Sequence, residues 1–179
     1  MIKISLKSQK TTQSSAAGMI LFLLVCFAIS RLSVQAASTA TVTATVTVQN
    51  VSVSVEDGTV TYGTLATSSS TNTAAAGLDD SQTATNDGNV ASDLNIRGQN
   101  TTAWTLAGSV GADQYKHDFC VTDCDGTPTW TALTTNYQAL ATGVAASGTQ
   151  VFDLRINTPS SSSSYTQQSA DITVQAVAA

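Results

Sequence analysis

Histidine, glutamate and basic residues are scarce in this chain of 179 residues, which has one histidine and seven lysines and arginines against twelve acids. General acid–base catalysis near neutral pH usually relies on histidine, or on a carboxylate whose pKa is raised by burial or by a neighbouring acid. The chain also has no G-x-S-x-G, no H-E-x-x-H and no phosphate-binding glycine motif. We therefore expect no enzymatic activity.

Long apolar runs are also absent, because the longest one covers only residues 19–29. A helix that crosses a bilayer needs about 20 apolar residues, so eleven are too few. The run is preceded by lysines and followed by small residues, which is the order of a secretory signal: Lys3, Lys7, Lys10, then Val34, Gln35 and Ala36. We predict a signal peptide of residues 1–36, cut between Ala36 and Ala37. Two alternatives are a retained membrane anchor and a pilin-type leader cut after Gly18.

Removal of this leader leaves three basic residues, Arg97, Lys116 and Arg155, against all twelve acids, a net charge of −9. Phosphate binding needs a basic face, so nucleic acid is excluded as a partner. Residues 37–179 are enough for a single domain with one core. We expect a secreted or cell-surface protein that contacts a membrane only during export.

Alternation with a period of two dominates the remaining chain. In residues 40–48 alanine or valine occupies the even positions and threonine all the odd ones, and Val51, Val53 and Val55 then take the odd positions. Because a slip of one residue turns every side chain to the opposite face, Gln49 and Asn50 must form a bulge, a bend or a break between strands. Asp57 and Gly58 predict a turn, with residues 59–65 as the partner strand of a hairpin.

Residues 66–89 lose the apolar rhythm and are predicted to form a long surface loop. Alternation returns in several short segments, marked by Leu94 and Ile96, Trp104 and Leu106, Phe119 and Val121, residues 151–156, and Ile172 to Ala176. The best helical candidate, residues 137–146, is interrupted by Gly143. We predict an all-β fold, a mainly antiparallel β-sandwich of seven or eight strands, Ig-like or jelly-roll-like. Tyr165 is expected to pack at the base of the last strand.

Only three cysteines are present, and Cys26 lies in the predicted leader. Cys120 and Cys124 are predicted to form a disulfide, because an exported chain meets an oxidising compartment. The alternative is a zinc site formed by both cysteines and His117, with Asp123 or Asp125 as the fourth ligand.

Aspartates cluster in two regions of expected loops. Hard cations bind carboxylate oxygens from loops, so calcium is a possible cofactor, with these candidate ligands: Asp79, Asp80, Asp87, Asp118, Asp123 and Asp125. Neither cluster follows the EF-hand order. The alternative is that Asp, Asn and Gly occur there because they favour turns.

The aromatic residues offer one further kind of site. Trp104 shares its parity with Leu106 and is expected in the core. Trp130, with Tyr115 or Tyr137 on the same face, could stack against sugars if these rings are exposed. A carbohydrate-binding module for cell-wall or other polysaccharide is therefore the alternative function.

The segment Ala103-Trp104-Thr105-Leu106 resembles the W-x-L signature of bacterial WxL domains, which are secreted β-domains associated with the cell wall. Those domains usually carry a second W-x-L near the C-terminus, where this chain has only Trp130-Thr131-Ala132-Leu133, a W-x-x-L inside the chain. The layout of signal peptide, Thr/Val-rich first strand and single sandwich also resembles donor-strand filament subunits of the TasA and chaperone-usher pilin kind. This resemblance implies assembly into filaments.

The first mature residues support the same idea. They form an uncharged segment near the predicted mature terminus, which can pair with the sheet edge of a neighbouring copy: Thr41, Val42, Thr43, Ala44, Thr45, Val46, Thr47 and Val48. We call residues 41–48 the N-terminal segment. The sequence thus predicts a structural or adhesive surface protein, whose partners are further copies of itself or other surface proteins.

Overall fold

The structure is a computed structural model that describes residues 38–179. The predicted signal peptide and its cleavage site lie outside the described residues. Contacts divide the chain into two units, Met1–Val46 and Thr47–Ala179. No helix among residues 38–179 has the length and apolar character that a membrane span requires.

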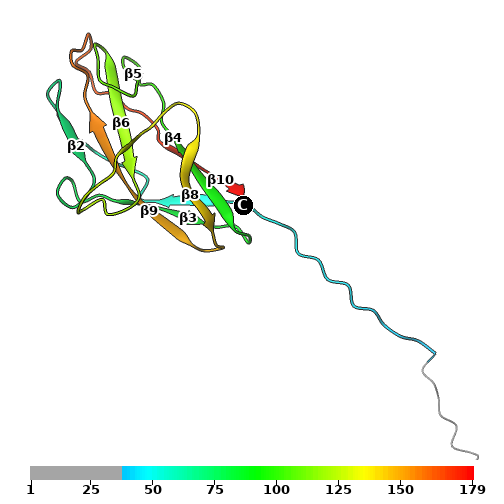
Figure 1. Cartoon of the computed structure of the whole chain (residues 1–179). Helices are drawn as coiled ribbons and strands as arrows, with labels where there is room; N and C mark the ends of the chain where they lie inside the picture. Colours follow the sequence, from blue (N-terminus) through cyan, green and yellow to red (C-terminus); the bar gives the residue numbers. More distant parts are fainter. Residues whose placement is uncertain (1–37) are drawn as a thin grey trace, which may run out of the picture. The chain divides into compact units, whose positions relative to one another are not determined.

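The described residues contain ten β-strands and no helix (Figure 1). The strands are β1 (Val53–Glu56), β2 (Ser70–Asn72), β3 (Gln82–Asn86), β4 (Ser92–Arg97), β5 (Thr105–Leu106), β6 (Gln114–Cys120), β7 (Thr131–Ala132), β8 (Gln138–Val144), β9 (Thr149–Asn157) and β10 (Thr173–Ala178). The predicted all-β class is confirmed, with more and shorter strands than the seven or eight expected.

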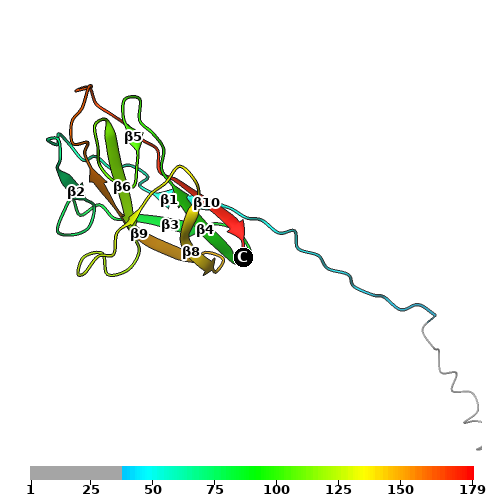
Figure 2. The same cartoon turned by 45° about the horizontal axis from the view of Figure 1, so that its top comes forward.

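The strands form two sheets, an arrangement consistent with the predicted β-sandwich. The larger sheet has the order β1-β3-β9-β6-β5, with β2 on β9 and β7 on β6, and the smaller one has the order β10-β4-β8. All pairs are antiparallel except the short pair of β5 with β6. In Figures 1 and 2 the smaller sheet lies next to the part of the larger sheet formed by β3 and β9.

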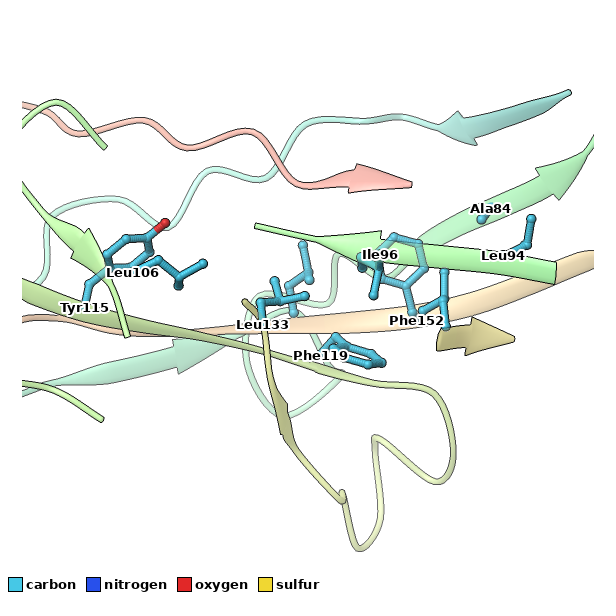
Figure 3. Close-up of a cluster of buried hydrophobic side chains, with 10 residues drawn as sticks. Ala84, Leu94, Ile96, Leu106, Tyr115, Phe119, Leu133 and Phe152 are labelled. Atoms are coloured by element: carbon cyan, nitrogen blue, oxygen red, sulfur yellow. The ribbon is translucent and has the colours of Figure 1, made fainter. Parts of the chain in front are cut away.

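One apolar core joins the two sheets. The smaller sheet contributes Leu94, Ile96 and Leu140, and the larger one contributes among others Phe119, Phe152 and Leu154. Figure 3 shows Leu106 beside Tyr115 towards one end of this cluster and Leu94 beside Ala84 towards the other. Because side chains alternate across a strand, every second residue of β4 and β9 faces this core.

The predicted hairpin of residues 53–65 is wrong in its second half. Asp57 and Gly58 do form the turn, each with a φ of 66°. However, β1 pairs with β3, with Val53 opposite Asn86 and Glu56 opposite Thr83, and residues 59–65 form no strand. After the turn, Val60 and Tyr62 pack against the core, so their apolar alternation serves packing without strand pairing.

The long loop predicted for residues 66–89 is also wrong, because it contains β2 and β3. Both strands pair with the edge of β9 that β6 leaves free, β2 with Arg155–Asn157 and β3 with residues 149–152. The inward residues of β3 are Gln82, Ala84 and Asn86, all buried. Burial therefore alternates along β3 while hydrophobicity does not, so the apolar pattern could not reveal this strand.

Two further expectations, for residues 137–146 and for Tyr165, differ from the structure. The weak helical candidate at residues 137–146 is the strand β8. Tyr165, expected to pack under the last strand, is 90% exposed. Its place against the core is taken by Ala170 and Ile172, which follow it in the chain.

Candidate functional site

The strand predicted for residues 40–48 is not a strand among the described residues of this single chain. Every residue from 38 to 50 is exposed, and Val42, Val46 and Val48 expose 91%, 90% and 81% of their surface. Exposed valines are common singly, but here they repeat on one parity of an uncharged segment. The segment therefore has the sequence of a strand, and no strand among residues 38–179 of the same chain pairs with it.

The point where this segment joins the domain is fixed by Asn89. The backbone N–H of Asn50 donates to the Asn89 side chain at 2.8 Å, and the Asn89 side chain donates to the Val48 carbonyl at 2.9 Å. The backbone N–H of Asn89 also donates to the Asn50 carbonyl at 3.1 Å. The phase break predicted at Gln49 and Asn50 is therefore the place where the chain leaves the folded unit.

Cys120 and Cys124 are joined by a disulfide, with 5.9 Å between their Cα atoms. Both thiolates that the zinc alternative needs are consumed by this bond, so that alternative is wrong. His117 lies on β6 with its ring next to those of Tyr62 and Tyr115. The bond closes a short loop directly after β6, where the chain stops pairing with β9.

We expect the disulfide to stabilise the domain modestly. In the chain-entropy model, closing so small a ring raises the free energy of unfolding by about 2 kcal/mol. The double variant Cys120→Ala/Cys124→Ala should lose about this amount in urea unfolding. A reductant should destabilise the wild type equally and leave the variant unchanged, whereas equal stability of both proteins would contradict a stabilising role.

The six candidate calcium ligands do not come together. Asp118 is buried on β6 in ion pairs, Asp80 accepts a hydrogen bond from Gln82, and Asp79 and Asp87 are exposed outside the strands. Asp123 accepts hydrogen bonds from the Thr127 hydroxyl and backbone, which hold the pKa of its carboxyl below the usual value. Among residues 38–179 no group of three or more His, Cys, Asp or Glu side chains is placed to hold a metal ion.

A shallow pocket of about 250 Å³ lies beside the disulfide loop. It is lined by Ser81, Val121, Asp123, Cys124, Asp125, Val151 and Asp153. Asp125 accepts a hydrogen bond from the Ala75 backbone at 2.7 Å, and Asp153 accepts bonds from Thr73 and Ser81 at 2.8 Å each. These carboxylates thus hold loops of the chain itself together.

Asp118 is the centre of a buried polar cluster on the outer face of β6 and β9. Its Oδ2 accepts from Arg155 Nε and Nη2 at 2.9 and 2.8 Å and from Asn157 Nδ2 at 3.0 Å. Its Oδ1 lies 2.9 Å from Lys116 Nζ. Asp118 is fully buried while both cations keep about a quarter of their side chains exposed. The two partly exposed cations thus compensate the buried charge of Asp118.

The aromatic residues proposed for sugar stacking do not form one exposed face. Tyr115 is 1% exposed and its hydroxyl donates to the Gln99 carbonyl, so it cannot contact a sugar. The guanidinium of Arg155 lies 4.7 Å from the centre of the Trp130 ring, and that of Arg97 lies 4.7 Å from the centre of the Tyr137 ring. One face of each ring is therefore already covered by an arginine.

Trp104, expected in the core, is half-buried and packs against its margin. The ring centre lies 6.2 Å from that of Tyr115, and its Nε1 donates to the Ser162 hydroxyl at 2.8 Å. Leu106, which shares its parity, is buried. Trp104 thus holds the serine-rich loop of residues 160–164 against the sheet.

Sequence reasoning did not find the pair formed by the half-buried Tyr62 and the buried His117. The Tyr62 hydroxyl and His117 Nε2 share a hydrogen bond of 2.8 Å, and His117 is 4% exposed. Burial lowers the pKa of His117 to about 4, an effect that the nearby Asp118 charge partly opposes. Burial also raises the pKa of Tyr62, and it raises that of Tyr115 to about 12. Both groups of the pair are therefore neutral at pH 7.

No protein-family model, curated protein or solved structure matches this chain. The interpretation of the site therefore depends on the geometry of the described residues.

Proposed function

We propose that this chain is a secreted structural subunit of the cell surface, which assembles by donating its N-terminal segment as a strand to a neighbouring copy. The observation that carries the proposal is the exposure of alternating valines in a segment that has strand sequence and no strand partner within the described part of the chain. Full burial of one valine contributes roughly 1.5–3 kcal/mol, so pairing that covers Val42 and Val46 is strongly favourable. The layout shared with donor-strand filament subunits supports the same reading.

The join between segment and domain favours donation to another copy. Asn89 holds Asn50 and the Val48 carbonyl in place, so the domain has a defined end to which the segment is attached. Because residues 38–48 contribute no buried side chain to the folded unit, the domain does not need them for its core. A segment that the domain does not need is free to add to an exposed sheet edge elsewhere.

Deletion of residues 41–47 tests the proposal directly. We expect the exported wild-type protein to form filaments visible by electron microscopy, and the deletion variant to stay monomeric. The melting temperature of the variant should match that of wild-type monomer, because only exposed residues are lost. Filaments formed by the deletion variant, or a domain that unfolds without the segment, would contradict the proposal.

A matched pair of substitutions tests whether one face of the segment is buried on assembly. Val42→Asp/Val46→Asp places two charges on the apolar parity, and Thr43→Asp/Thr45→Asp places the same two charges on the other. The first should raise the concentration needed for assembly at least about 100-fold, since two buried valines are lost. The second should change it far less. Equal effects of the two variants would show that only the added charge matters. That outcome would contradict the burial of one face of the segment on assembly.

A further inference from the structure

We infer that the outer edge of β10 is the acceptor of the donated N-terminal segment in the next copy, an inference that rests on the proposed function. The described residues offer several strand edges without a partner, and they differ in how well they are protected against pairing. An edge strand that is long, regular and uncharged is open to the addition of another strand. We therefore compare the free edge strands by their length, their charge and the regularity of their pairing.

Most of the free edges are too short. The strands β5 and β7 have two residues each and β2 has three. The half of β9 that β6 does not reach, residues 149–152, is four residues long and lies beside the acidic pocket. Such edges give few ladder hydrogen bonds to an eight-residue segment.

Two longer edges are protected. The strand β1 has four residues, ends on Glu56 and runs into Asp57, which has a positive φ. The strand β8 has seven residues, but its register against β4 shifts twice and Gly143 has a φ of 62°. Charges, bulges and kinks of this kind are the usual means by which edge strands resist pairing.

The strand β10 has none of these protections. Its six residues, TVQAVA, carry no charge and no proline, and they pair with β4 in unbroken register from Thr173 opposite Arg97 to Ala178 opposite Ser92. The backbone N–H of Ala179 donates to the Ala91 carbonyl, so by alternation the N–H groups of Val174, Ala176 and Ala178 point away from β4. No acceptor among residues 38–179 pairs with these groups, which form a regular row of donors.

The side chains of β10 also match the segment. Val174 and Ala176 are half-buried at the margin of the core, opposite the buried Ile96 and Leu94, while Gln175 and Val177 are exposed on the outer face. A donated strand whose valines face inward extends this apolar margin, and its threonines then stand beside Gln175 and Val177. Eight residues are enough to cover the six of β10.

Donor and acceptor are different parts of the same chain, so each copy can give its segment to one neighbour and receive a segment from another. An interface of this head-to-tail kind continues without limit unless the rotation closes a ring. The predicted assembly is therefore an open fibre whose sheets are extended at β10.

Cross-linking between two proteins that each carry one cysteine in addition to the native disulfide identifies the acceptor edge. Full-length chains carrying Thr43→Cys, Thr45→Cys or Thr47→Cys are exported, mixed with chains carrying Gln175→Cys, assembled and oxidised. Directly opposed residues on paired strands are close enough for a disulfide. The controls are Ser54→Cys on β1 and Ala139→Cys on β8, both exposed on the outer faces of the rival edges.

We expect at least one of the three donors to give about tenfold more covalent dimer with Cys at 175 than with Cys at 54 or 139. Capture at 54 or 139, or at none of the three, in filaments that still depend on residues 41–47 overturns the β10 assignment and leaves the proposed function standing. Filaments that do not depend on residues 41–47 overturn the proposed function itself.

Discussion

Replacing Asp118 by alanine is expected to lower the free energy of unfolding by about 3 kcal/mol. Removal of one partner from a buried ion pair typically costs about 3–5 kcal/mol, because the other charge is left without compensation. We expect the lower end of this range, since Arg155 and Lys116 keep about a quarter of their side chains in contact with solvent. Urea unfolding of the wild type and of Asp118→Ala, followed by tryptophan fluorescence, measures the difference.

Two companion variants make this measurement specific. Asp171 is exposed, so Asp171→Ala should change stability by no more than about 0.5 kcal/mol while removing the same charge. A double-mutant cycle of Asp118→Ala with Arg155→Ala isolates the interaction between the two side chains. A coupling energy near zero would show that the two hydrogen bonds from Arg155 to Asp118 contribute little.

The domain should lose stability as the pH falls from 6.5 towards 4, because of His117. The pKa of this histidine is about 4 in the folded protein and 6.5 in the unfolded chain, so only the unfolded chain binds the proton in this range. The full stability is therefore present above pH 6.5 and decreases below it. Over the whole range the loss is on the order of 3 kcal/mol, at 1.36 kcal/mol per pH unit.

The range from pH 6.5 to 5 is the cleanest for this test, because His117 is the only histidine and most carboxyl groups titrate at lower pH. Urea unfolding should show a loss of about 2 kcal/mol across these 1.5 units. In His117→Gln the hydrogen bond with Tyr62 changes at every pH, but the slope in this range should disappear. A wild type whose stability is constant between pH 6.5 and 5 would refute the burial of a neutral imidazole.

Strands with large inward side chains could be predicted from the sequence, and strands with small or polar ones could not. Leu94 and Ile96 in β4, and Phe152 and Leu154 in β9, alternate with polar residues and reveal both strands. In β3 the buried positions hold Gln82, Ala84 and Asn86, and specific hydrogen bonds make the burial of the two polar side chains possible. Asn86, for example, donates to the carbonyls of Val90, Val144 and Ala145.

Pairing partners were harder to predict than strands. The turn at Asp57 and Gly58 follows from local chemistry, but the partner of β1 is β3, about thirty residues further along the chain. The same limit applies to the candidate site. The exposed N-terminal segment follows from its alternation and lack of charge, whereas the free edge at β10 depends on which strand takes the place beside β4.

The contacts around Asp153 have a consequence for sequence variation. Between β2 and β3 the chain leaves the edge of β9 for residues 74–80, and Thr73 and Ser81 on either side both donate to the Asp153 carboxylate. The backbone N–H of Asp80 donates to the Thr73 carbonyl at 2.7 Å, which closes the loop of residues 74–80 at its base. At its tip the N–H of Ala75 is held by Asp125, so extra residues are best placed after the exposed Ala76, where the pairing of β2 and β3 with β9 keeps its register. This makes Ala76 a natural position for length variation and for display of a foreign peptide.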